Sequence, residues 1–127
     1  MSEIKKKNRN NAEQQTQIAI VQWAKKHREQ YPVLRWLHHI PNGEKRNMRT
    51  GAILKLMGVE SGVWDLFLPA GMQWYHGLYI EVKATKGKLS EKQTEFQNFV
   101  LSQKFMCVVV MSKEEGIKAL KQYLSLK

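Results

Sequence analysis

The sequence has little cysteine, no long apolar run and a shortage of acidic side chains. Cys107 is the only cysteine, and it lies inside the apolar segment FMCVVVM. A disulfide within the chain is therefore excluded, and we expect Cys107 to be a reduced core residue without a metal-binding or catalytic role. No signal-peptide pattern is present, and no apolar run approaches the roughly 18 residues of a membrane span. We therefore expect a soluble, intracellular protein of the cytoplasm.

The shortage of acids leaves the chain strongly basic. Eleven Asp and Glu residues stand against 21 Lys and Arg, which gives a formal net charge of +10 at pH 7. This charge favours an anionic partner, and nucleic acid is the first candidate. The 127 residues, 43% of them hydrophobic, suffice for one domain with one core. Residues 1–10 are polar and basic without periodicity, so we interpret them as a flexible tail before a single domain over residues 11–127.

Helical spacing marks the first part of this domain. An amphipathic helix is predicted from Asn11 to about Gln30, where Tyr31 and Pro32 end it. Its expected buried stripe is Ile20, Trp23, Ala24 and His27. Residues 35–40 (RWLHHI) are typical of a short strand. A second, shorter helix, which Gly58 can cap, is predicted from Ala52, Ile53, Leu56 and Met57.

The rest of the domain alternates strands with helices. Residues 63–69 (VWDLFLP) and 77–83 (GLYIEVK) predict an antiparallel hairpin. A capped helix begins after Ser90, and its expected buried face is Phe96, Phe99 and Val100. The segment FMCVVVM predicts a strand covered on both sides, and a last helix begins after Ser112. This order predicts an α/β fold with a central mixed four-stranded sheet flanked by helices.

An acid interrupts the first strand of the hairpin. A buried, ionised Asp65 costs several kcal/mol unless it finds a partner. A loop centred on Gln73 places Asp65 and Glu81 eight residues to either side, which makes them cross-strand neighbours. Two like charges in this position destabilise a sheet, and a divalent cation relieves the conflict. Hard oxygen ligands at this separation suit Mg²⁺ or Mn²⁺.

A lysine joins the two acids. Lys83 lies two residues after Glu81, so strand alternation returns its side chain to the same face. Two acids and an ammonium group match the needs of phosphodiester hydrolysis, in which a metal activates water and a cation stabilises charge on phosphorus. The triplet Glu-x-Lys alone is a weak signal, because Glu3-Ile4-Lys5 repeats it in the basic tail.

Four ordered motifs resemble one nuclease family. The segments HHIPNGEKR, GVWDLFLP, LYIEVK and GKLSEKQ are similar to the VRR-NUC family, the virus-type replication-repair nucleases of the PD-(D/E)xK superfamily. The resemblance covers nearly the whole chain and implies a restriction-endonuclease-like fold. One departure is visible, because Trp64 stands where the family pattern has a proline before the aspartate. This change concerns local backbone geometry more than catalysis.

The resemblance implies roles for six residues. Asp65 and Glu81 would bind the metal together with the main-chain carbonyl of Val82, and Lys83 would be catalytic. Glu13 and Gln93 are implicated as well. Glu13 points along the stripe of the first helix toward the sheet, although an acid in a first turn also answers the helix dipole. A capping bond back to Ser90 would explain Gln93 without an active site.

Cations predict where DNA would lie. Lys45, Arg46 and Arg49 gather at the start of the second helix, where the dipole disfavours cations and a phosphate would offset it. A solvated basic turn is the alternative. Lys86 and Lys88 follow the presumed catalytic strand and are placed to hold the backbone near the metal. For His38 and His39 we expect structural roles or minor-groove contacts. The loop residues Trp74, Tyr75 and His76 could stack on bases or meet a second subunit.

Together these features predict a metal-dependent DNA endonuclease. The family resemblance implies a homodimer that acts on branched DNA such as four-way (Holliday) junctions. Recognition by charge and shape suits so small a domain. A sequence-specific or flap endonuclease is one alternative. The other is a noncatalytic DNA-binding module whose acids serve only structure.

Overall fold

A computed structural model of the protein describes residues 2–42 and 48–127. The strands of this part form one sheet in the order β1-β2-β3-β4, with antiparallel β1–β2 and β2–β3 pairs and a parallel β3–β4 pair. The predicted α/β fold with a mixed four-stranded sheet flanked by helices is confirmed. In chain order the elements are α1 (Glu3–Lys26), the 3₁₀ helix η1 (Pro32–Trp36), β1 (His38–His39), α2 (Met48–Leu56), β2 (Leu66–Leu68), β3 (Leu78–Val82), α3 (Glu91–Ser102), β4 (Met106–Val110) and α4 (Lys113–Leu124).

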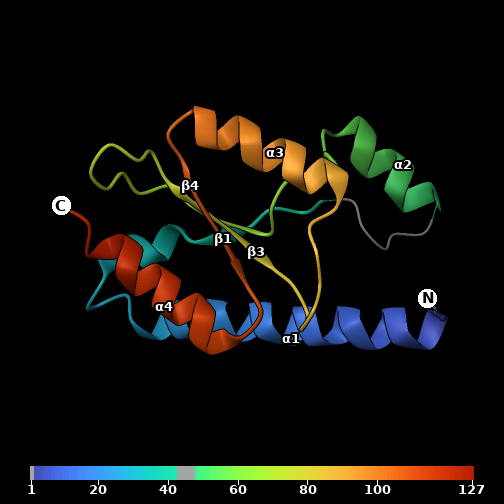
Figure 1. Cartoon of the computed structure of the whole chain (residues 1–127), viewed down its shortest axis with the longest axis horizontal. Helices are drawn as coiled ribbons and strands as arrows, with labels where there is room; N and C mark the ends of the chain where they lie inside the picture. Colours follow the sequence, from blue (N-terminus) through green and yellow to red (C-terminus); the bar gives the residue numbers. More distant parts are fainter. Residues whose placement is uncertain (1, 43–47) are drawn as a thin grey trace.

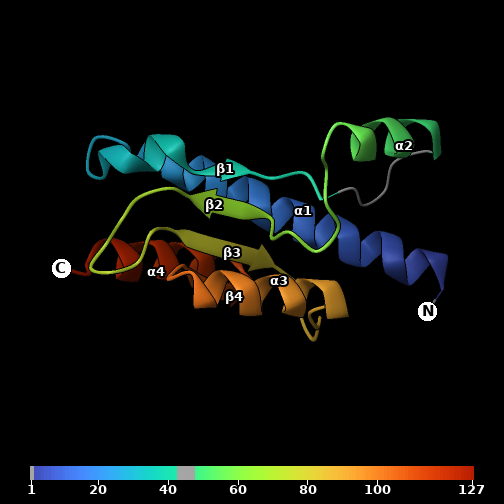
Figure 2. The same cartoon turned by 90° about the horizontal axis from the view of Figure 1, so that it is seen from above.

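Helices cover both faces of the sheet. Figure 1 shows the strands with α3 on one side and with α1 and α4 on the other. Figure 2 looks through these layers from above and shows β1, β2 and β3 side by side. Alternation along β2 and β3 sends the leucine and isoleucine side chains into the core against α1 and α4. The fully buried core residues include Ile20, Leu66, Leu68, Leu78, Ile80, Val110 and Leu120. Among the described residues, no helix combines the length and apolarity needed to cross a lipid bilayer.

The strand β4 is covered by helices on both faces, as predicted, but it lies at the edge of the sheet. Its side chains are therefore half-buried, except for Val110, which is fully buried. Cys107 lies in this strand as a free thiol. Burial raises the pKa of Cys107 to about 11, so the thiol stays protonated at neutral pH.

The first helix is longer than the sequence pattern predicted. Its N-cap is Ser2, whose hydroxyl accepts from the Lys5 amide at 3.3 Å, and the helix runs from Glu3 instead of Asn11. The prediction of a tail without regular structure is therefore wrong. Lysine and arginine are good helix formers, so a segment that buries no apolar side chain can still extend an existing helix. Of the predicted stripe, Ile20 and Ala24 are buried.

The second helix forms where it was predicted, and Gly58 ends it. Gly58 has φ +106°, its amide donates to the Lys55 carbonyl, and the Val59 amide donates to the Leu54 carbonyl, which together make a Schellman motif. The apolar residues from which the helix was predicted, Ala52, Ile53, Leu56 and Met57, are exposed instead of packing in the core. Leu56 is 89% exposed and Met57 is 76% exposed.

Two further expectations need correction. Residues 35–40 are not one strand, because η1 occupies them as far as Trp36 and β1 contains only His38 and His39. Phe99 is 62% exposed, so it does not belong to the buried face of α3 with Val100. Helical spacing brackets a face but does not fix how far around the helix its neighbours reach.

The hairpin has the predicted register. Its loop turns at Gln73, which has φ +56°, between the bridged residues Met72 and Tyr75. The pairs Leu66↔Ile80 and Leu68↔Leu78 follow from this centre. One step beyond β2, the same register sets Asp65 opposite Glu81.

Candidate functional site

The two acids meet across the end of the hairpin. The Asp65 amide donates to Oε1 of Glu81 at 3.2 Å, and the Val82 amide donates to Oδ2 of Asp65 at 2.9 Å. Each carboxylate thus accepts from the backbone of the opposite strand, which holds both side chains in place. Glu81 is only 2% exposed, whereas Asp65 is half-buried. The predicted cross-strand proximity of the acids is present.

The second oxygen of Glu81 has two further partners. Oε2 of Glu81 lies 3.5 Å from Nζ of Lys83 and accepts from Nε2 of Gln93 at 2.8 Å. At the same time Oε1 of Gln93 accepts from the main-chain amide of Ser90 at 2.8 Å, and the Ser90 hydroxyl accepts from the main-chain amide of Gln93 at 3.1 Å. The capping box and the contact with Glu81 therefore exist together. The two interpretations of Gln93 do not compete, because its amide group has an acceptor and a donor end.

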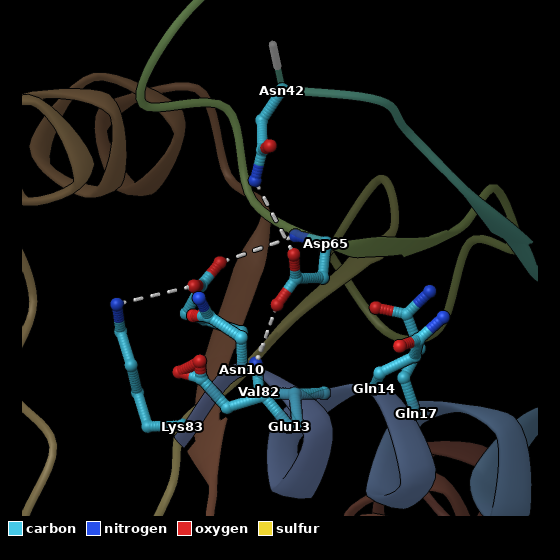
Figure 3. A pocket seen from close by; sticks show the side chains of 9 residues that line it. Asn10, Glu13, Gln14, Gln17, Asn42, Asp65, Val82 and Lys83 are labelled. Atoms are coloured by element: carbon cyan, nitrogen blue, oxygen red, sulfur yellow. Dashed lines mark hydrogen bonds and ion pairs between the residues drawn. The ribbon is translucent and has the colours of Figure 1, made fainter. Parts of the chain in front are cut away.

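The acids open into a pocket of about 130 Å³ at the end of the sheet (Figure 3). Glu13 lies on the α1 side of this pocket, so the first helix brings a third carboxylate toward the site. In Figure 3, Lys83 lies on one side of Asp65, and Gln14 and Gln17 lie on the other side. The residues that line the pocket are Asn10, Glu13, Gln14, Gln17, Asn42, Asp65, Glu81, Val82 and Lys83.

Comparison with known proteins agrees with this arrangement. The family model for the VRR-NUC domain matches residues 11–114. The chain belongs to the VRR-NUC family. A solved structure described as a VRR_NUC domain protein has 26% sequence identity and a TM-score of 0.75, with 91% of this chain and 89% of that chain covered. Among curated proteins, none matches significantly.

Membership of the VRR-NUC family makes this a nuclease domain of the PD-(D/E)xK type. Nucleases of this type use divalent metals, and the donor set at the hairpin end suits a hard cation, because it consists of carboxylate and carbonyl oxygens. Across residues 2–42 and 48–127, no three His, Cys, Asp or Glu side chains are grouped so as to hold a metal ion. The fit therefore rests on a site with two carboxylates, which is enough for an ion that keeps several waters.

Trp64, where this chain departs from the VRR-NUC pattern, has a structural task. Its indole is fully buried, and Nε1 donates to the main-chain carbonyl of Gln93 at 3.0 Å. Gly62 also meets α3 closely, because a Cβ at this position would lie 2.8 Å from Cβ of Lys92. The segment before Asp65 is thus tied to the first turn of α3, which carries Gln93.

The sequence pattern did not identify four VRR-NUC pocket residues, namely Asn10, Gln14, Gln17 and Asn42. Nδ2 of Asn42 donates to Oδ1 of Asp65 at 3.4 Å. Asn42 lies in the motif HHIPNGEKR, but nothing in its spacing connects it with Asp65. Helical spacing could have identified Gln17, which lies four residues after Glu13. Asn10 lies in the segment that the sequence pattern predicts to be a flexible tail, so the pattern does not mark it as a pocket residue.

Of the predicted DNA contacts, the three that the structure describes do not line the pocket. Lys86 and Lys88 are exposed in the loop after β3, and Arg49 is exposed in the first turn of α2. Lys45 and Arg46 lie outside the described residues. Lys86 has φ +67°, a left-handed conformation that suits glycine better than lysine.

The two histidines of β1 make structural contacts. Nδ1 of His39 lies 2.8 Å from the carbonyl oxygen of Asp65, which also accepts from the Ile40 amide at 2.8 Å. His38 packs edge-on against Phe67, with ring centroids 5.9 Å apart. The strand β1 therefore holds the backbone of Asp65 from the side opposite β3. Of the hairpin-loop aromatics, Trp74 is exposed and Tyr75 packs against the core.

Proposed function

We propose that this VRR-NUC domain is a metal-dependent DNA endonuclease that hydrolyses phosphodiester bonds. One observation carries the proposal: the acids Asp65 and Glu81 face each other across the hairpin end, and Nζ of Lys83 lies 3.5 Å from Oε2 of Glu81. A purely structural pair of acids would not need a pocket lined by further polar groups, and this pair opens into one.

Three oxygen donors would hold a Mg²⁺ or Mn²⁺ ion. These are the carboxylates of Asp65 and Glu81 and the main-chain carbonyl of Val82. The amide of Val82 points at Asp65, and in an extended strand the N–H and C=O of one residue point to the same side. The carbonyl of Val82 therefore faces the space beside Asp65. Once bound, the ion would supply a water of lowered pKa and neutralise charge on the phosphate.

The remaining side chains would act on the substrate or on the acids. Lys83 brings a positive charge to the pocket, where it would orient the attacking water and stabilise the charge that develops on phosphate oxygens. Gln93 fixes the rotamer of Glu81 through its 2.8 Å hydrogen bond. Glu13 lines the pocket, where it would accept a hydrogen bond from a water molecule.

Exposed cations would hold the DNA backbone. Lys86 and Lys88 lie in the loop that follows β3 and Lys83. Arg49 lies in the first turn of α2, three residues after Arg46 and four after Lys45 in the sequence. The left-handed backbone of Lys86 supports this role, because strained residues persist where function uses them. A glycine at this position would relieve the strain but lose the charge.

For the substrate we propose branched DNA, with four-way junctions as the leading case, cut by a homodimer. The proposal rests on the resemblance to VRR-NUC proteins. It is supported by the exposed apolar side chains Leu56 and Met57, since apolar residues are enriched in the cores of homodimer interfaces. Light scattering should therefore give the mass of two chains. If the complex with junction DNA contained only one protein chain, paired cutting would be excluded.

Cleavage of labelled four-way junction, flap and linear duplex DNA, with Mg²⁺, Mn²⁺ or EDTA, tests the function. We expect metal-dependent nicking of the junction, and a loss of about 10²–10³-fold in the Lys83→Met variant. Lys113→Met removes an exposed lysine on α4 and is the matched control, with unchanged cleavage expected. Preferred cutting of flaps or of one duplex sequence would support the alternative endonucleases, and binding without cutting under every metal would support a noncatalytic module.

A further inference from the structure

One face of α1 changes its chemistry along the helix. Residues seven apart lie almost one above another, because seven residues complete nearly two turns. Two such rows lie side by side, Lys6–Glu13–Ile20 and Asn10–Gln17–Ala24. Both rows begin at the exposed end of the helix and end in the core.

Each stage of these rows has its own surroundings. Ile20 and Ala24 are buried against the sheet and α4. Glu13, Gln17 and Asn10 line the pocket. Lys6, one turn before Asn10, is exposed. The pocket face of the helix is therefore continued by a cation.

The cations in this part of α1 are not part of the hydrophobic core. Lys5, Lys6, Lys7 and Arg9 stand against one acid, Glu3, and all five side chains are exposed. Cations in the first turns of a helix oppose its dipole, so they weaken the helix slightly. In Figures 1 and 2 this end of α1 projects past the strands on the side where β3 ends.

We propose that residues 3–10 of α1 form a DNA-binding arm, in which Lys6 contacts a backbone phosphate about three base pairs from the cleaved bond. This inference rests on the proposed nuclease function and names a further part of its substrate path. Lys6 and Glu13 are about 10 Å apart along the helix axis. Since duplex DNA rises about 3.4 Å per base pair, a duplex that runs along α1 brings Lys6 to the backbone about three base pairs from the pocket.

Lys6 and Lys5 make a matched pair for the test. Both are exposed lysines in the same turn, but Lys5 is rotated by about 100° from Lys6, away from the pocket face. Glutamine preserves helix propensity, so Lys6→Gln and Lys5→Gln should both fold as the parent protein does, which circular dichroism can check. Both substitutions remove one charge, so any difference between them reports position.

Binding of junction or duplex DNA is measured as a function of salt in EDTA, in the Lys83→Met background. We expect Lys6→Gln to weaken binding about fivefold at low salt and to reduce the slope of log K against log salt by about one, as loss of one phosphate contact does. Lys5→Gln should change affinity less than twofold. Equal losses of DNA affinity in the two variants, or no loss in either, would overturn the proposal of a DNA-binding arm.

Cleavage of shortened duplex arms gives a second readout in the protein with Lys83 intact. With long DNA on both sides of the cut, Lys6→Gln should cleave more slowly than the parent at subsaturating substrate. When one side is cut back to two base pairs, the difference should vanish, and truncation of the other side should preserve it. A difference that survives both truncations overturns the proposal. Absence of metal-dependent cleavage by the parent would instead refute the nuclease proposal. The binding test needs no cleavage, so it would still decide whether Lys6 contacts DNA.

Discussion

Two neighbouring cross-strand pairs of the β2–β3 hairpin show how one backbone arrangement carries opposite chemistry. Phe67 and Tyr79 are directly paired, and their rings stack with centroids 4.4 Å apart. Two residues along each strand, the same face carries Asp65 and Glu81. The helix α3 covers both pairs, with Phe96 edge-on to Tyr79 at 5.1 Å and Gln93 bonded to Glu81.

The two pairs differ in what they need from their surroundings. Stacked aromatic rings stabilise a hairpin through burial and ring geometry. Opposed carboxylates destabilise it unless backbone amides, a lysine, an amide side chain or a cation offset their charge. All of the first three are present around Asp65 and Glu81. The aromatic pair thus stabilises the hairpin that holds the acids together.

The largest expected effect comes from removal of one acid. Asp65→Asn should lower metal-dependent cleavage by at least about 100-fold, because a charged metal ligand is lost. In EDTA the variant should be more stable than the parent, with Tm about 3 to 6 °C higher, since one like-charge repulsion disappears.

Thermal unfolding with and without Mn²⁺ measures this effect. The parent should gain stability when Mn²⁺ is added, and Asp65→Asn should gain much less. If metal stabilised both proteins equally, the assigned ligands would be wrong.

The aromatic pair should show the reverse behaviour. Phe67→Ala should destabilise the protein by about 2 kcal/mol, less than a fully buried phenylalanine would, because Phe67 is half-buried. Cleavage by the folded variant should stay within threefold of the parent. Urea unfolding and cleavage well below the midpoint measure the two quantities. A loss of cleavage as large as that of Asp65→Asn would remove the contrast between the pairs.

The covering helix allows a smaller test. Ser90→Ala removes the N-cap hydroxyl and should cost about 1 kcal/mol with little change in cleavage. Gln93→Leu removes the reciprocal capping bond and also the bond to Glu81, so it should lower both stability and kcat. The comparison isolates the contact between Gln93 and Glu81. Identical kcat values for the two variants would reduce Gln93 to a capping residue.

The smallest effect is expected at Cys107, a residue of β4 that is paired with Tyr79 of β3. Burial raises the pKa of its thiol from 9.0 to about 11, so folding disfavours the thiolate. The resulting stability is fully present below pH 9 and is lost as the pH rises from 9 to 11. At pH 8 the native thiol should react with a thiolate-specific disulfide reagent about 100-fold more slowly than in denaturant. Equally fast reactions would show that Cys107 is not protected.

Several features of the site could be predicted because they follow local rules. The turn at Gln73 and the period of two set the hairpin register, and from it the meeting of Asp65 with Glu81 and Lys83. The capping box at Ser90 depends on residues three apart. Trp64 shows the limit of such rules: the motif marks it as a departure, and only its buried bond to Gln93 shows why the chain tolerates it.

The sequence by itself determined the order of the α-helices and strands, the N-caps of α3 and α4 and the hairpin register, since each depends on neighbours within a few residues or on strand alternation. Only the tertiary structure decided that Asn42 meets Asp65, that Gln93 reaches Glu81 from its cap, and that Phe99 stays exposed. These outcomes depend on how α3 and the segment before α2 lie against the strands. That placement results from packing of the whole core, which no local spacing records.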